Sequence, residues 1–320
     1  MPSPSALLSP ASLKGVLSAA DAAAALGEGF AAAGADAVAC PVADGGEGTA
    51  AAIAAVRGGT WRAVAVSDPL GRRVTARWLE LPDGTGVVES ADPLGLWRLT
   101  PDELDPLRAT SRGLGELIVA AGERPLLVCL GGVATVDGGR GLRGVVDRLP
   151  EGTRVACDVR SPLLAAATLF ARQKGASDAQ VAELERLLEG DPVLAPFASL
   201  PGAGAAGGLG AALAALGGEL VPGAALVLET LDFDRRLREA ALVVTGEGTV
   251  DRTSREGKAP AEVVARAGAA RVPCVVFGGI VDEPLADVET VALSGDPSRA
   301  AEDLVELGRR LGRRLARTPR

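Results

Sequence analysis

The chain has 320 residues, of which 48% are hydrophobic, so it can bury a substantial core and has the length of two domains. Its formal net charge of −8, without a basic patch interleaved with aromatic residues, excludes a typical nucleic-acid-binding surface. No apolar run reaches the roughly 18 residues of a membrane span, and the start lacks the charged segment of a secretory signal. We therefore expect a cytoplasmic protein that binds neither nucleic acid nor membranes.

Several residue types are missing or rare. The chain has no histidine, tyrosine or asparagine, which excludes a serine-histidine triad, a histidine-ligated metal and a histidine general base. Four widely spaced cysteines form no C-x-x-C pair and indicate core residues in a reducing compartment. Only Lys14, Lys174 and Lys258 are lysines among 33 basic residues. Their retention suggests phosphate contacts that need a compact ammonium, and chance retention is the alternative.

The first 60 residues alternate short apolar runs with helices. The run at residues 6–9 predicts a strand, and Ser18 is a good N-cap for a helix that ends near Phe30. The next run, ADAVACPV, ends in an acidic glycine loop that carries Asp44 and Glu47 before another helix. This repeat of strand, loop and helix is typical of parallel α/β sheets, which bind ligands at the carboxyl ends of their strands.

The pattern changes at Trp61. Alternating polar and apolar residues over 61–89, broken by DPLG and PDG, predict a β-hairpin and a domain boundary near residue 60. A helix over 108–121 then leads to a strand that ends in GGVATVDGG. A further strand over 155–159 and an exposed helix over 177–190 follow.

The segment PGAGAAGGLG matches G-x-G-x-x-G, but it follows no strand, so a dinucleotide fingerprint is excluded. We expect a tight, anion-capable loop that opens a helix at Leu209. Near the C-terminus, PCVVFGGIVD predicts a strand, and the arginine-rich residues 298–317 predict an amphipathic surface helix.

Residues 241–260, ALVVTGEGTVDRTSREGKAP, are the most informative stretch. Leu242, Val243 and Val244 predict a strand that Gly246 and Gly248 break, and Ala259-Pro260 predicts a helix start. Glu247, Asp251 and Lys258 then lie near the carboxyl end of a strand. Carboxylates suit Mg²⁺, and a lysine beside free helix N–H groups suits phosphate, so the stretch indicates Mg-nucleotide chemistry. An ordinary loop with solvated charges is the alternative.

These elements predict a two-domain α/β fold. A Rossmann-like lobe with a parallel sheet comprises residues 1–60 and 241–320, and an inserted α/β lobe with hairpins comprises residues 61–240. We expect the active site in the cleft between the two lobes. We expect a monomer or a homodimer.

Nine motifs in order resemble the type I family of glycerate kinases. They are LLSPASLKGVLSA, CPVADGGEGTA, VSDPLGRRV, ATSRGLGELI, CLGGVATVDGG, ACDV, FARQKGA, PGAGAAGGLG and VVTGEGTVDRTSREGKAP. The resemblance implies a two-domain α/β enzyme that transfers the γ-phosphoryl group of ATP to D-glycerate with Mg²⁺, with 2-phosphoglycerate favoured as the product. Phosphoryl transfer mainly requires that the reactants be positioned and that the charge of the phosphates be neutralised. Carboxylates, lysines and helix ends can do both.

The resemblance also implies roles for individual residues. The catalytic candidates are Asp44, Asp251 and Lys14. The candidates for substrate or phosphate binding are Lys258, Ser12, Lys174, Gly131, Gly132, Thr135 and Gly204. The candidate metal ligands are Glu47, Asp137 and Glu247.

The chain departs from the family pattern in its loops. Ala11 and Leu13 replace an aspartate and a phenylalanine, and Val133 and Val136 replace a serine and an asparagine. Thr253 replaces a glutamine, and the segment between the GGVATVDGG motif and ACDV is shorter. Two alternatives therefore stay open: a family member that has lost catalysis and binds a metabolite or partner, and a kinase for another small hydroxy acid.

Overall fold

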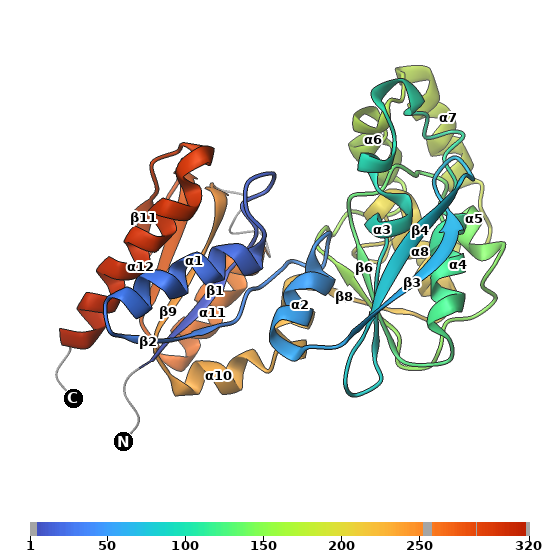
Figure 1. The fold of residues 1–320 in the computed structure, drawn as a ribbon. Coiled ribbons are helices and arrows are strands. Elements are labelled where there is room, and N and C mark those ends of the chain that lie inside the picture. The colour runs from blue at the N-terminus through green and yellow to red at the C-terminus, as the bar shows by residue number, and fades with distance from the viewer. Residues whose placement is uncertain (1–4, 252–257, 286, 318–320) are drawn as a thin grey trace. The chain divides into compact units, whose positions relative to one another are not determined.

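The computed structural model describes residues 5–251, 258–285 and 287–317, which form two compact units (Figure 1). Unit 1 comprises Met1–Asp44, Ala51–Arg57 and Ala224–Arg320. Unit 2 comprises Gly45–Ala50 and Gly58–Gly223. The chain thus returns to unit 1 at Ala224, earlier than the residue 241 predicted from the sequence.

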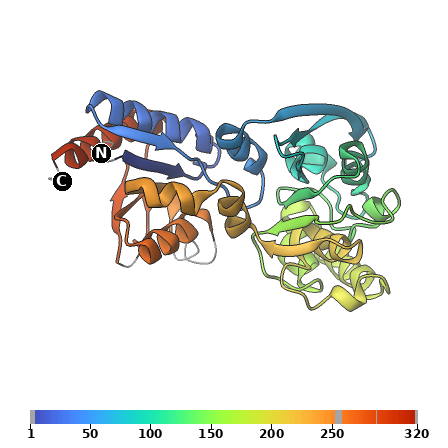
Figure 2. The ribbon, with the colours of Figure 1, turned by 90° about the horizontal axis from the view of Figure 1, so that it is seen from below.

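Unit 1 contains a five-stranded parallel sheet in the order β11-β10-β9-β1-β2. Its strands are β1 (Ser5–Pro10), β2 (Asp36–Ala39), β9 (Ala240–Val250), β10 (Cys274–Val281) and β11 (Glu289–Ala292). Its helices are α1 (Ala19–Ala32), α2 (Thr49–Arg57, which begins in unit 2), α9 (Gly223–Thr230), α10 (Phe233–Glu239), α11 (Ala259–Ala270) and α12 (Ala300–Arg317). Helices α1 and α12 cover one face of the sheet and α11 covers the other (Figures 1 and 2). This is the predicted parallel α/β arrangement.

Helices α1 and α12 pack with their backbones in close contact. A Cβ atom added at Gly29 would lie 2.1 Å from the carbonyl oxygen of Val305, and one at Gly308 would lie 2.3 Å from that of Leu26. The predicted N-cap is confirmed, since the Ser18 hydroxyl accepts a hydrogen bond from the N–H of Asp21. The predicted C-terminal helix is also confirmed, and its apolar residues lie in the core of unit 1.

The prediction that Gly246 and Gly248 end their strand is wrong. β9 continues to Val250, and its register with β10 pairs Gly246 with Phe277 and Glu247 with Gly278. A Cβ atom at Gly246 would lie 2.2 Å from the carbonyl oxygen of Phe277, so the missing side chain lets the two strands approach closely. Here a glycine within a strand marks close packing and not a turn.

Unit 2 contains a six-stranded sheet in the order β3-β4-β5-β6-β7-β8. Its strands are β3 (Thr60–Ser67), β4 (Arg73–Glu80), β5 (Gly86–Glu89), β6 (Leu126–Leu130), β7 (Arg154–Cys157) and β8 (Glu219–Pro222). The first three are antiparallel, which confirms the predicted hairpin, and β5 to β8 are parallel.

The helices of unit 2 enclose one apolar core against this sheet. The α-helices are α3 (Ala91–Leu94), α4 (Arg112–Ala121), α5 (Arg140–Arg143), α6 (Ala165–Phe170), α7 (Asp178–Glu189) and α8 (Ala205–Ala215), and the 3₁₀ turns include η1 (Leu96–Arg98) and η3 (Arg172–Lys174). Within α8, Ala206, Gly207 and Gly208 are left-handed, so regular turns begin at Leu209, as predicted.

Candidate functional site

The candidate residues form two groups, one on each unit. Each group lies mainly on loops that follow the carboxyl ends of parallel strands, where open α/β sheets bind ligands. Thr253, one of the departures from the family pattern, lies outside the described residues.

In unit 1, Ser12 and Lys14 lie exposed on the loop that follows β1. Between them, the side chain of Leu13 is only 3% exposed and is part of the core, and a backbone bridge joins it to Leu17. Leu13 therefore anchors the loop in place of the aromatic residue of the family. Asp44 is half-buried on the segment that follows β2. In this segment the N–H of Val42 donates a hydrogen bond to the carbonyl of Pro10 at the end of β1.

Glu247 lies near the carboxyl end of β9, and Asp251 directly follows that strand; both are half-buried. Lys258 is the N-cap residue of α11, with Pro260 in the first turn, as predicted. Its Nζ lies 3.8 Å from the Glu247 carboxylate, and the two side chains are 31% and 15% exposed. A partly exposed ammonium thus stands at the positive end of a helix, next to a carboxylate. Such an arrangement can bind phosphate.

In unit 2, two glycine loops from different strands touch each other. A Cβ atom at Gly131 would lie 3.2 Å from the Cα of Gly46, and one at Gly132 would lie 3.0 Å from Oε2 of Glu47. Gly132 is left-handed, with φ of 65°. The glycines therefore allow the backbone of the GGVATVDGG loop to approach the acidic loop, and they place the exposed Glu47 beside Gly132.

Sequence analysis missed Glu89 and Ser90, which lie at the carboxyl end of β5. The Glu89 carboxylate accepts hydrogen bonds from the N–H groups of Ala50, at 2.6 Å, and Gly48. Burial raises the pKa of Glu89 above the ordinary carboxyl range, and these two N–H groups oppose the shift. Ser90 Oγ lies 3.2 Å from both the N and the O of Gly131. The sequence signal for this site was VVES, in which an acidic residue ends an apolar run.

Asp137 holds backbone groups together. Its Oδ2 accepts hydrogen bonds from the N–H and hydroxyl of Ser111, at 3.0 and 2.7 Å, and from the N–H of Gly141 at 3.0 Å. Its Oδ1 accepts from the N–H of Gly139 at 3.0 Å. These four donors take up most of the carboxylate's capacity, which supports a structural role at the starts of α4 and α5. Its assignment as a metal ligand stays a prediction.

Lys174 is a buried lysine, 3% exposed at the end of η3. Its Nζ donates a 2.8 Å hydrogen bond to the carbonyl of Thr135. Burial lowers its pKa to about 7, and the charge of Asp137 opposes the shift. Thr135 is fully buried, and its hydroxyl has no hydrogen-bond partner among the described residues.

Gly204 is buried, and its N–H donates to the carbonyl of Ser161. A Cβ atom there would lie 2.4 Å from the carbonyl oxygen of Pro162, so packing explains this glycine. Val133 and Val136 are 2% and 1% exposed and belong to the apolar core of unit 2. Their apolar side chains thus stabilise the core beneath the loop, which weakens the inference that they indicate a lost site.

Among residues 5–251, 258–285 and 287–317, no group of three aspartate, glutamate, cysteine or histidine side chains is arranged to hold a metal ion. Mg²⁺ commonly uses one or two carboxylates together with substrate phosphates, so Glu247 and Asp251 fit such a shared site. In the same part of the chain, no helix is both long enough and apolar enough to cross a bilayer.

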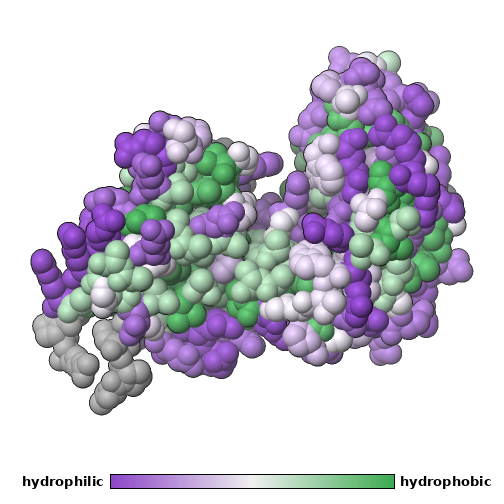
Figure 3. Space-filling model, viewed as in Figure 1, coloured by the Kyte–Doolittle hydropathy of each residue, from purple (hydrophilic) through white to green (hydrophobic). Residues whose placement is uncertain are grey.

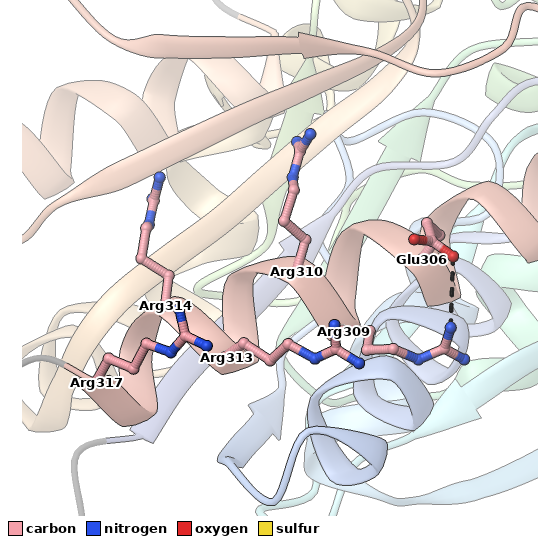
Figure 4. A pocket seen from close by; sticks show the side chains of 6 residues that line it. All are labelled: Glu306, Arg309, Arg310, Arg313, Arg314 and Arg317. Carbon is pink, nitrogen blue, oxygen red and sulfur yellow. Dashed lines mark hydrogen bonds and ion pairs between the residues drawn. The ribbon is translucent and has the colours of Figure 1, made fainter.

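A surface depression on α12 is lined by none of the candidate residues. It is lined by Glu306, Arg309, Arg310, Arg313, Arg314 and Arg317 (Figure 4). The arginines point in two directions, Arg310 and Arg314 to one side and Arg309, Arg313 and Arg317 to the other (Figure 4). Hydrophilic residues also gather at this end of α12 in Figure 3. We interpret this surface as a solvated helix face.

Known proteins resemble the chain over most of its length. The sequence model of the glycerate kinase family matches residues 6–146 and 143–295. Glycerate 2-kinase of Escherichia coli K12 is 37% identical, with 87% of this chain and 86% of that protein covered. Glycerate kinase of Bacillus subtilis 168 is 35% identical, with 86% and 85% covered. A crystal structure from Salmonella typhimurium LT2, provisionally named glycerate kinase 2, superposes with a TM-score of 0.86 at 30% identity and covers 98% and 99% of the two chains.

Proposed function

This chain belongs to the glycerate kinase family, and we propose that it transfers the γ-phosphoryl group of ATP to D-glycerate, with 2-phosphoglycerate as the favoured product. In this reaction a hydroxyl oxygen of glycerate bonds to the γ-phosphorus, and the bond from the γ-phosphorus to the bridging oxygen of ADP breaks. The hydroxyl proton passes to a carboxylate.

The observation that carries the proposal is the group formed by Lys258, Glu247 and the N-terminus of α11. Lys258 combines an ammonium with the positive end of a helix, so it suits a phosphate of ATP. Glu247, 3.8 Å from that ammonium, and Asp251 just beyond it supply oxygen ligands. Mg²⁺, when bound with ATP, would neutralise charge on the phosphates.

The other candidates take supporting roles in this proposal. Asp44 accepts the hydroxyl proton, and Lys14 and Ser12 contact the charged groups of the substrates from the loop after β1. In unit 2 the touching glycine loops present Glu47, Gly131 and Gly132. The expected place of the active site, in a cleft between the lobes, stays a prediction, as do the cytoplasmic location and a monomeric or homodimeric state.

The test is ADP release by the purified protein in a coupled assay with D-glycerate, ATP and Mg²⁺. We expect turnover that stops when the divalent cation is chelated and resumes with Mg²⁺ or Mn²⁺. Phosphorus NMR of the product, compared with both phosphoglycerates, identifies the oxygen that is phosphorylated.

Two other outcomes would assign a different function. Turnover with another small hydroxy acid, and none with glycerate, would change the acceptor and keep the kinase chemistry. No turnover with any acceptor, together with a melting temperature that rises with a nucleotide or metabolite, would support a binding protein that has lost catalysis.

A further inference from the structure

Lys174 cannot readily serve as the phosphate-binding cation that the sequence suggested. Its side chain is 3% exposed, and its Nζ is committed to the carbonyl of Thr135 at 2.8 Å. A cation that binds substrate phosphates must present its donors to the ligand, as the partly exposed Lys258 does.

The bond from Lys174 adds an anchor at Thr135 in the GGVATVDGG loop, residues 131–139. Backbone hydrogen bonds to residues 94–96 hold residues 132–134. The loop is held at its start by Ser90, whose hydroxyl meets the N and the O of Gly131. It is held at its end by the hydrogen bonds to Asp137 and by the bond from the N–H of Gly138 to the carbonyl of Gly207. Within the described residues, Lys174 makes the one side-chain hydrogen bond to residues 132–136.

Burial lowers the pKa of Lys174 to about 7, and the charge of Asp137, in the same loop, opposes this shift. Burying an amine costs free energy, and a hydrogen bond made by the amine offsets part of that cost. The carbonyl of Thr135 accepts that hydrogen bond.

We propose that Lys174 is a positioning residue for phosphoryl transfer, which tethers residues 131–139 through the carbonyl of Thr135 and does not contact a substrate. The inference rests on the proposed function, since it assigns a role within that reaction. A positioning residue holds other groups in reactive geometry, so its loss lowers kcat, whereas loss of a substrate contact that binds the ground state raises KM.

The test compares wild type with Lys174→Met, whose unbranched side chain lacks the amine, by hydrogen exchange and by steady-state kinetics with ATP and D-glycerate. The matched control is Arg172→Met, which removes an exposed cation from the same turn, paired with Asp178. We expect exchange of amides in residues 131–141 to rise about tenfold in Lys174→Met, with β6 unchanged. We expect kcat to fall at least about tenfold, while each KM changes less than about threefold. Arg172→Met should change neither the amide exchange nor the kinetic constants.

Three results would overturn the proposal: unchanged exchange in residues 131–141, an unchanged kcat, or a large rise in KM at constant kcat. Should Lys174→Met fail to fold, Lys174→Gln, which keeps an N–H donor without the charge, is compared with wild type by the same measurements. In Lys174→Gln we expect a smaller rise in exchange and a smaller fall in kcat than those given for Lys174→Met, and no change in either would overturn the proposal. If wild type shows no turnover, the proposed function fails, and the exchange comparison still tests the tether.

Discussion

The Glu89 carboxylate accepts a 2.6 Å hydrogen bond from the N–H of Ala50, which joins the end of β5 to the first turn of α2. The N–H of Gly48, in the acidic glycine loop, donates to the same carboxylate. One half-buried acid therefore satisfies two N–H groups where the loop leads into the helix, and it fixes the loop that carries Glu47.

We expect Glu89→Gln to retain stability at pH 7 and Glu89→Ala to lose about 1–3 kcal/mol, because only alanine leaves the N–H of the buried Ala50 without its acceptor. The pKa of Glu89 is raised in the folded state, so its protonated form favours folding and this contribution is lost as pH rises through the folded pKa. The stability of wild type relative to Glu89→Gln should therefore increase as the pH falls toward the ordinary carboxyl range. Urea unfolding at several pH values measures this difference, and a flat difference would contradict it.

The lowered pKa of Lys174 predicts that the free energy of unfolding depends on pH above neutrality. Its pKa is about 7 in the folded protein, against 10.5 for an ordinary lysine, so between these values the unfolded chain binds one more proton. The stability of wild type relative to Lys174→Met should thus rise with pH by up to about 1.4 kcal/mol per unit over this window, and level off below pH 7. Denaturant unfolding of both proteins between pH 6 and about 10 checks the slope. A slope of the opposite sign would show that the ammonium is stabilised by folding.

Lys258→Arg should impair the use of ATP. A guanidinium is larger and planar, so it cannot take the place of a compact ammonium beside Glu247 without moving the phosphate contact. We expect kcat/KM for ATP to fall about tenfold or more. The control is Arg266→Lys on the same helix, where the arginine pairs with Glu262 and Asp234. An unchanged kcat/KM in Lys258→Arg would contradict the inference that the few lysines are retained for contacts to phosphate.

Asp44→Asn and Asp251→Asn should each lower turnover by orders of magnitude, since an amide keeps the shape of the carboxylate but neither accepts a proton nor binds Mg²⁺ well. The melting temperature should stay equal or rise, because residues selected for catalysis are seldom those that stabilise the fold best. Coupled assays and thermal melts of the same preparations separate the two effects. Full activity in either variant would exclude that residue from catalysis.

Much of the fold was predictable because periodicity and capping are local signals. Ser18 caps α1, and the turns after Trp61 produce the antiparallel strands. The error at Gly246 has a physical cause, since the sequence does not show that Phe277 of a strand distant in sequence approaches its backbone.

The site was less predictable for the same reason. The motifs identified Lys174 and Asp137 as polar residues of the right loops, but their burial and partners depend on contacts with Thr135 and Ser111, which are distant in sequence. Glu89 was missed because it ends a short strand within a hairpin region, where an acid also fits an exposed turn.

The division into two units has a consequence for spectroscopy. The three tryptophans, Trp61, Trp78 and Trp97, all lie in unit 2, and the chain has no tyrosine. Intrinsic fluorescence therefore reports the unfolding of unit 2 alone, whereas far-ultraviolet circular dichroism reports helices of both units. Coincident transitions from the two probes would mean that the units melt as one cooperative body, and a fluorescence-silent transition would belong to unit 1.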